Sequence, residues 1–345
     1  MTLRGDGSPG VTGVPMPAGA GDSRRIALNR ERLAAWLQRS GAVVALVVVV
    51  VLATLVFGGR FASVDNFLNI LEASAFLGLV AVGMTFVIVG GGIDLSVGSL
   101  LALSAVLAAY GSQYGSVVAV LLPLTVCASI GLANGLLVAR ARLAPFIVTL
   151  ATLLFARGLA FAVSDEGNTI YHIEAGMPVL ALGQGSVGPL RVPVIIAAVA
   201  FVLGWVYLNR TRYGAAVAAI GGSEDAARLM GVPIARVKTA MYVTSGLLAG
   251  LAGLLVAARS SSGQSTIGVG LELQAIAAVV IGGTLLTGGA GSVVGTVAGV
   301  LLLNVINNVI NQVGSLSSYF QQVVSGVFLI AVVLVQRYLA REQRL

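Results

Sequence analysis

The sequence predicts an all-α, polytopic membrane protein, and three observations support this prediction. Hydrophobic residues make up 57% of the 345 positions and charged residues only 10%, with a mean hydropathy of +0.99. This is more apolar surface than one soluble core can hide. The apolar residues are also collected in long runs, and a helical run of roughly 20 residues crosses the hydrocarbon core of a bilayer. Glycine supplies 45 residues, and many of them interrupt these runs.

Ten apolar runs predict about ten transmembrane helices. They cover residues 41–57, 67–89, 95–110, 116–139, 144–163, 192–208, 238–258, 271–286, 291–312 and 319–336. Several runs are shorter than the length that a membrane-spanning helix needs. We therefore expect some of these Gly-rich helices to be broken, or to be buried against protein rather than lipid.

The basic residues predict how these helices are oriented. If the N-terminus is cytoplasmic, 16 of the 20 Lys and Arg residues lie on the inner side, while only Arg60, Arg191 and Arg259 lie on the outer side. Cytoplasmic loops are enriched in Lys and Arg, so this distribution places both termini in the cytoplasm. Membrane topology thus explains the net charge of +7, because the basic residues cluster in short loops. Nucleic acid is therefore not an expected partner.

The chain divides into a tail, a membrane domain and a short end. Residues 1–40 are Gly- and Pro-rich and then basic, which predicts a disordered cytoplasmic segment rather than a signal peptide. Residues 41–338 form the membrane domain, and residues 339–345 form a cytoplasmic tail. Only one Cys and one His are present, Cys127 in an apolar run and His172 in a polar loop. No metal site, catalytic residue or membrane-enzyme constellation is expected from this set.

Two loops are long enough to carry structure of their own. The outer loop, 164–191, is either a solvated connector or a docking surface for an extracytoplasmic partner. The inner loop, 209–238, contains a short predicted helix at 223–232. It either lies on the inner surface of the protein itself or fits a groove on a cytoplasmic partner, with apolar anchors at its end. Its residues are Ser223 as the cap, Glu224 and Asp225 in the first turn, then Ala226, Arg228, Leu229, Met230 and the terminating Gly231.

Polar residues inside the spans are candidate functional residues. The amides of Asn304, Asn307, Asn308 and Asn311 share one helical face, since they fall at i, i+3, i+4 and i+7. They suit the hydroxyls of a sugar in a transport pathway, a contact with a second chain, or hydrogen bonds between helices of one chain.

Arg157 also lies inside a span, and its guanidinium stays charged at any relevant pH. It needs an acidic partner, access to water or several carbonyl groups. Glu72 and Glu272 lie near the outer ends of their spans. We expect a structural ion pair between Arg157 and one of them.

The stretch "VGGGIDLSVGS" at 89–99 places a single carboxylate, Asp94, between two apolar runs. Gly90–Gly92 break the preceding helix. Asp94 is predicted to cap the next helix by accepting hydrogen bonds from amides two or three residues on. Direct sugar contact, an ion pair or a gating contact are the alternatives. A similar stretch, "VVIGGTLLTGGAGSVVGTVAGV" at 279–300, indicates an internal repeat, which is typical of transporters.

Four stretches resemble the permease subunits of ribose-type carbohydrate ATP-binding cassette (ABC) importers. They are "GMTFVIVGGGIDLSVGSLLALSA" (83–105), "NGLLVARARLAPFIVTLATLLFARGLA" (134–160), "TRYGAAVAAIGGSEDAARLMGV" (211–232) and "GVGLELQAIAAVVIGGTLLTGGAGSVVGTVAGV" (268–300). With the spans between them, the resemblance covers about residues 40–338. The last third is most similar in appearance to the galactofuranose-type branch of this family.

This resemblance implies a multi-pass protein of the bacterial inner membrane that moves a pentose or hexose, such as ribose or galactofuranose, inward by alternating access. It implies three partners: an extracytoplasmic sugar-binding protein, a second permease chain, the same or related, and a cytoplasmic ATPase that binds ATP and Mg. Residues 223–232 would be the element that couples to the ATPase. The chain itself has no G-x-x-x-x-G-K-[ST] loop, so it is expected to be a transport subunit without a cofactor of its own.

The alternative function is secondary, ion-coupled transport of a small polar solute. Such a transporter would share the apolar spans and the breaks within them. The spans offer no evident relay of acidic or His side chains, which argues against ion coupling.

Overall fold

The computed structural model describes residues 41–313 and the separate positions 323, 326, 327 and 330. Among the described residues, the regular secondary structure is helical apart from four strands of two residues each. The basic segment 1–40, most of the tenth apolar run at 319–336 and the tail 339–345 lie outside the described residues.

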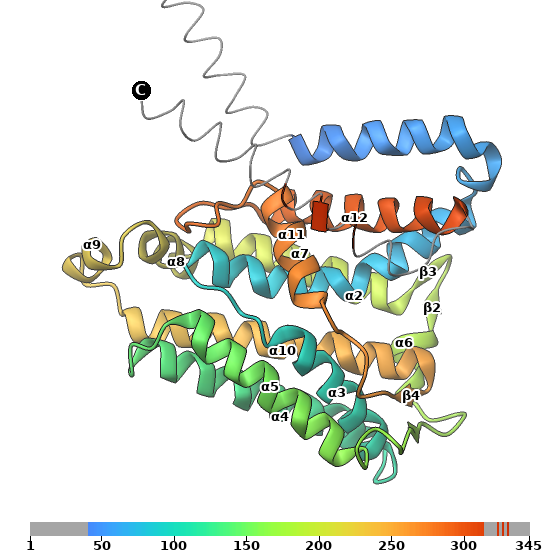
Figure 1. Cartoon of the computed structure of the whole chain (residues 1–345), viewed down its shortest axis with the longest axis horizontal. Coiled ribbons are helices and arrows are strands. Elements are labelled where there is room, and N and C mark those ends of the chain that lie inside the picture. The colour runs from blue at the N-terminus through green and yellow to red at the C-terminus, as the bar shows by residue number, and fades with distance from the viewer. Residues whose placement is uncertain (1–40, 314–322, 324–325, 328–329, 331–345) are drawn as a thin grey trace, which may run out of the picture.

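Seven helices of the described region are long and apolar enough to cross a membrane. They run side by side in Figure 1, with α8 and α9 at one end of the bundle and the strands with α6 at the other. The all-α, polytopic prediction is therefore confirmed. The seven are Gly41–Arg60, which ends in the 3-10 turn η1 (Gly58–Arg60), α2 (Val64–Val89), α4 (Ser116–Ala139), α5 (Pro145–Val163), α7 (Val192–Arg210), α10 (Ile234–Ser260) and α12 (Val293–Val313).

Two of the expected spans are short, as the sequence predicts, and lie inside the bundle. They are α3 (Val97–Ser112) and α11 (Leu271–Ile281), with 16 and 11 residues, which at 1.5 Å per residue gives about 24 and about 17 Å. Helix α3 has the predicted length, whereas α11 is shorter than its predicted run 271–286. Neither length matches the roughly 30 Å of a hydrocarbon core. Every residue of α3 except Tyr110 is buried, so the irregular backbone beside these helices is shielded by protein.

The two Gly-rich stretches form equivalent turns. At the end of α2, the amides of Gly91 and Gly92 donate back to carbonyls in its last turn, and Gly283 and Thr284 do the same at the end of α11. This is the Schellman pattern, which needs a left-handed residue, and φ is +79° at Gly91 and +87° at Gly283. Both turns then lead into another helix, α3 or α12. The shared geometry supports the predicted internal repeat.

The end of α2 meets the loop that follows the α11 turn, at the end of the bundle that carries α8. The amide of Gly289 donates to the carbonyl of Val89 across 2.8 Å. The end of α8 (Arg212–Gly222) lies against this contact, and a Cβ at Gly221 would collide with both the Val89 carbonyl and the Gly289 amide. Backbone thus packs directly on backbone here, which only glycine permits.

The outer loop 164–191 is folded onto the ends of α3 and α10. In it, β1 (Tyr171–His172) pairs with β4 (Ser262–Gly263), and β2 (Ser186–Val187) pairs with β3 (Leu190–Arg191), both antiparallel. Between them lies the short helix α6 (Leu180–Gln184). Ile173, Val179 and Leu180 are buried in one cluster with side chains of α3 and α10. The loop is therefore a packed cap and not a freely solvated connector.

Candidate functional site

Asp94 lies at the centre of the helical bundle and is completely buried. The segment from Gly92 to Asp94 is non-helical and joins the inner-end turn to the start of α3. One carboxylate oxygen, Oδ1, accepts hydrogen bonds from the amide of Ser96 at 3.0 Å and from its hydroxyl at 2.5 Å. The other, Oδ2, accepts from the hydroxyl of Ser245 on α10 at 2.8 Å.

The predicted cap geometry is wrong in one respect. Ser96 occupies the N-cap position of α3, and its own side chain makes no cap hydrogen bond. The predicted bond from the amide two residues on is present, but it closes a turn before the helix rather than capping it, a local pattern common for Asp side chains. Because its second oxygen reaches α10, Asp94 also joins two helices, which a simple cap does not do.

The hydrogen bonds around Asp94 continue into two further helices. Asn134 of α4 donates to the hydroxyl of Ser96 at 3.2 Å, and Thr152 of α5 donates to the Asn134 carbonyl at 2.5 Å. The hydroxyl of Tyr242 is buried without a hydrogen-bond partner among the described residues, and it lies directly beside Gly92. We call Asp94, Ser96, Asn134, Thr152 and Ser245 the Asp94 cluster.

The chemistry of this cluster is hydrogen bonding between helices. Within the described residues the ion pairs are Arg228–Glu224, Lys238–Glu224 and Arg259–Glu72, so Asp94 has no basic partner there. The same part of the chain holds no group of three or more His, Cys, Asp or Glu side chains suited to a metal. A fully bonded carboxylate at this depth fixes the start of α3 relative to α4, α5 and α10.

Arg157 makes no direct ion pair among the described residues, although its charge and that of Glu272 attract each other at longer range. Its guanidinium Nη1 donates to the backbone carbonyls of Ser265 at 2.6 Å and Ile267 at 2.7 Å. Glu72 pairs with Arg259 instead, at 3.0 Å, and Glu272 packs against Gly98 in the first turn of α3. The reason is that the irregular segment before α11 has carbonyls free of helical hydrogen bonds, and α5 brings Arg157 to them.

The four asparagines of α12 do not act as one set. Asn308 exchanges two side-chain hydrogen bonds with Asn66 of α2, at 3.2 and 2.8 Å, and this part of the prediction therefore resolves as helix–helix bonding. Asn304 donates to Val300 in its own helix at 3.0 Å. The carbonyl oxygen of Asn307 is enclosed without a hydrogen-bond partner among the described residues, and Asn311 is exposed.

The short inner helix α9 (Glu224–Leu229) lies where the sequence predicts it. The hydroxyl of Ser223 accepts from the amide of Ala226 at 3.3 Å, and Gly231 ends the helix with φ of +78°. Only Ala227 of this helix is buried. Figure 1 shows α9 at one extreme end of the molecule, beyond the ends of the long helices.

Two interactions hold the base of α9. Glu224 accepts from Lys238 of α10 at 2.5 Å and from Arg228 at 3.0 Å. The hydrogen bond from Lys238, together with the positive charges of both partners, holds the pKa of the Glu224 carboxyl below its ordinary value. At the other end of α9, Leu229 is 90% exposed and Met230 is 70% exposed. Asp225, Ala226 and Arg228 are exposed beside them. The base is thus anchored, while the apolar tip is free to meet another molecule.

The sequence patterns do not mark Asn134, Thr152, Ser245 or Tyr242 as candidate functional residues. Hydroxyl residues are common in membrane helices because they bond carbonyls of their own helix, as Thr152 does with Val148. The one signal that could have found Asn134 is that it is an amide inside an apolar run, like the asparagines of α12.

Comparison with known proteins places this architecture in a family. Residues 66–333 match the family described as branched-chain amino acid transport system / permease component. The chain is 42% identical over 303 residues to the ribose import permease protein of Bacillus subtilis (strain 168), covering 87% of this chain and 93% of that protein. It is 36% identical over 308 residues to the L-arabinose transport system permease protein of Escherichia coli (strain K12), covering 86% and 90%.

A third relative extends the range of sugars. The fructose import permease protein of Bifidobacterium longum (strain NCC 2705) is 35% identical over 305 residues, covering 86% of this chain and 89% of that protein. The sugars named in these relatives are ribose, L-arabinose and fructose, so the expected likeness to the galactofuranose-type branch is not supported. No solved structure matches the chain. The matched residues span α2 to α12 and beyond, and the chain therefore belongs to this family of ABC importer permease components, as a multi-pass inner-membrane subunit without an ATPase site.

Proposed function

We propose that this chain forms the membrane pathway of an importer that carries a monosaccharide, with ribose as the first candidate, and that a cytoplasmic ATPase drives it. Support for a sugar comes from relatives that are named for ribose, L-arabinose and fructose. The observation that carries the coupling to an ATPase is α9, whose Leu229 and Met230 are the exposed apolar tip of an otherwise anchored helix.

The ATPase binds ATP and Mg, and it receives the tip of α9 in an apolar groove. Leu229 and Met230 supply the apolar contact area, because such anchors carry most of the free energy of an interface. Glu224 and Ala227 hold the base of α9 to α10 and to the buried core. Movement of the ATPase is thereby passed to α10, which also carries Ser245 of the Asp94 cluster.

The pathway itself is proposed to lie along α12, at the contact with a second permease chain. Asn307 offers an amide oxygen without a hydrogen-bond partner among the described residues, which can accept from a sugar hydroxyl. The amide of Asn304 instead donates to Val300, and Asn308 is occupied by Asn66. Asp94 is proposed to position helices rather than to bind the sugar. Its hydrogen bonds to Ser96 and Ser245 join α3 to α10, and a change between inward- and outward-facing states must keep or exchange these bonds. The extracytoplasmic sugar-binding protein docks on the packed outer loop 164–191.

The experiment is to reconstitute the chain with its ATPase and binding protein and to measure both copurification and ATP-dependent uptake of labelled sugar. The variant Leu229→Asp/Met230→Asp should lose both, because it places two charges in an apolar contact. The matched control is Leu143→Asp, at an exposed leucine of the inner α4–α5 loop, which should keep both. Retained assembly and uptake in the double variant would refute the coupling role of α9.

The same assay separates the sugars and the alternative mechanism. Ribose, L-arabinose, fructose and galactofuranose are compared as unlabelled competitors, and ribose is expected to compete most strongly. Uptake that follows a proton or sodium gradient and ignores ATP would replace the proposal with secondary transport.

A further inference from the structure

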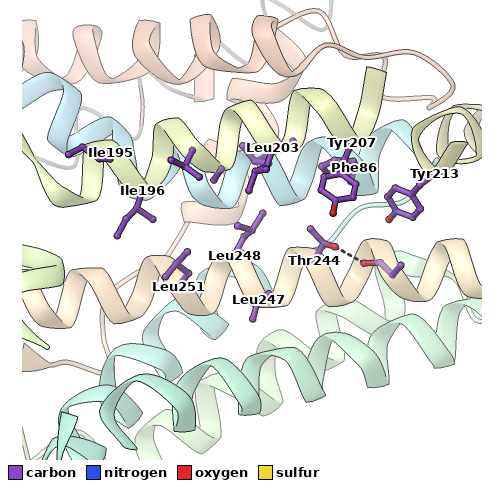
Figure 2. Close-up of a pocket in the computed structure, with 15 residues that line it drawn as sticks. Phe86, Ile195, Ile196, Leu203, Tyr207, Tyr213, Thr244, Leu247, Leu248 and Leu251 are labelled. Carbon is purple, nitrogen blue, oxygen red and sulfur yellow. Dashed lines mark hydrogen bonds between the residues drawn. The ribbon is translucent and has the colours of Figure 1, made fainter. Parts of the chain in front are cut away.

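A long apolar groove runs between α7 and α10, with α2 at its floor. Its volume is about 820 Å³, and its walls include Ile196, Leu203 and Tyr207 of α7 and Leu248 and Leu251 of α10. Figure 2 shows aliphatic side chains along most of its length, and Phe86, Tyr207 and Tyr213 gathered at one end. The hydroxyl of Thr244 in its wall already donates to Ala240. Walls of this kind cannot satisfy the hydroxyls of a sugar, so the groove serves a different occupant.

Arginines extend both walls of the groove at its inner end. On α7, Arg210 follows Tyr207 by three residues, and on α10, Arg236 precedes Ala240 by four, so each continues its lining face by one turn. Both are exposed. Neither takes part in an ion pair within the described residues, and the guanidinium of Arg210 lies over the ring of Trp205, 5.3 Å from its centroid. The mouth of an apolar groove thus carries uncompensated positive charge.

Tyr213 closes the same end. It lines the groove at the start of α8, and its hydroxyl is enclosed without a hydrogen-bond partner among the described residues. Arg212, also exposed, is its neighbour in the chain. By their positions on α7, α8 and α10, a donor without a partner and three exposed arginines belong to the same end of the groove, which the positive-inside distribution places at the cytoplasmic side of the membrane domain.

The length of the groove matches one leaflet of a bilayer. Its α7 wall extends from Ile195 to Tyr207, and the twelve steps between these residues rise about 18 Å at 1.5 Å per residue. Half of a hydrocarbon core is about 15 Å. An acyl chain that enters from the inner leaflet can therefore lie along the whole groove with its headgroup at the arginines.

We propose that this groove binds an anionic phospholipid of the inner leaflet, with an acyl chain between α7 and α10 and its phosphate held by Arg210 and Arg236. Guanidinium groups suit this role because they pair with phosphate oxygens through two parallel hydrogen bonds. Charge complementarity at the mouth selects an anionic lipid over a neutral one or an apolar helix. The lipid site is separate from the proposed sugar pathway. Lipid binding there is expected whichever solute the permease carries.

The first test compares lipid classes on the purified full-length chain. Nanodiscs containing phosphatidylglycerol or phosphatidylcholine are compared by native mass spectrometry, which counts retained lipids. The wild-type chain should retain phosphatidylglycerol preferentially. Arg210→Gln/Arg236→Gln should weaken that preference about 30-fold, since each arginine near an anionic surface contributes roughly fivefold. The control Arg140→Gln/Arg142→Gln removes the same charge from another inner loop and should keep the preference. An unchanged preference in the groove variant would overturn the proposal.

The second test fills the groove without changing charge. Ala200→Trp places a large ring between its walls and should abolish the retained lipid, whereas Leu154→Trp on the exposed face of α5 should not. If Ala200→Trp retains the lipid, the lipid does not lie in the groove. Other occupants are tested by cross-linking from the variant Leu203→Cys. Cross-links to the apolar run 319–336 or to a second copy of the chain would show a protein in the groove and overturn the proposal.

Discussion

The Asp94 cluster and the tip of helix α9 differ in burial and in whether their side chains find partners within the chain. Asp94 is fully buried, and both of its carboxylate oxygens accept hydrogen bonds. In α9 the apolar residue Leu229 is 90% exposed at the end of the bundle that the basic residues predict to be cytoplasmic. The carboxylate of Asp94 is thus satisfied within the chain, while the apolar side chain of Leu229 is not. Changes in the cluster should therefore reduce stability, and changes at the tip of α9 should reduce partner binding alone.

Replacing Asp94 with leucine should have the largest effect on stability. It removes the acceptor for the Ser96 amide and for the hydroxyls of Ser96 and Ser245. Buried donors without acceptors cost about 1–3 kcal/mol each, so the free energy of unfolding should fall by about 3 kcal/mol. Thermal unfolding in detergent measures the loss.

Asp94→Asn is the matched control. Its carbonyl oxygen can still accept from Ser96, and its amide nitrogen can donate to the hydroxyl of Ser245. It should unfold within about 1 kcal/mol of wild type and should keep transport. If Asp94→Leu is as stable as Asp94→Asn, the cluster does not hold the helices together and the contrast with α9 fails.

Arg157 should give the second-largest effect. Arg157→Met leaves the carbonyls of Ser265 and Ile267 without their donor, and the free energy of unfolding should fall by about 2 kcal/mol. Arg157→Lys should lose less, because an ammonium group can donate to both carbonyls. Amide hydrogen exchange in residues 264–270 reports the local loosening. The control is Arg60→Met, at an exposed outer residue, and equal exchange in Arg157→Met and this control would contradict the prediction.

The elements that the sequence predicts well are those set by local signals. Apolar runs place the long helices because their length is imposed by the bilayer. Helix α9 is predicted to within a few residues, because Ser223 and Gly231 supply a start and a stop signal that act within one turn. The run 271–286 is too long by several residues, since Gly283, in the left-handed conformation, turns the chain before the apolar residues end.

The pairings inside the bundle are harder to predict because they join distant residues. Ser245 bonds to Asp94 across 151 positions, and no local pattern in either segment encodes that contact. Arg157 shows the same limit. Its charge requires partners, but carboxylates and backbone carbonyls both meet the requirement, and only the path of the segment before α11 decides between them.

The smallest expected effect concerns Glu224, which holds the base of α9, in contrast to the exposed tip of the same helix. The pKa of its carboxyl is lowered from an ordinary value of 4.5, first by the hydrogen bond from Lys238. A lowered pKa means that the ionised form stabilises the docked helix above the ordinary value, and that this contribution is lost as pH falls through the folded-state pKa. Because Glu224 is partly exposed, the contribution is below about 1 kcal/mol. Hydrogen exchange corrected for its intrinsic pH dependence should show α9 opening more readily below about pH 4, with no change in α3. Glu224→Gln should open readily at every pH, whereas Asp225→Asn, at an exposed neighbour, should follow wild type. If Asp225→Asn abolishes the pH dependence, or if wild type shows none, the Glu224–Lys238 bond does not hold the base of α9.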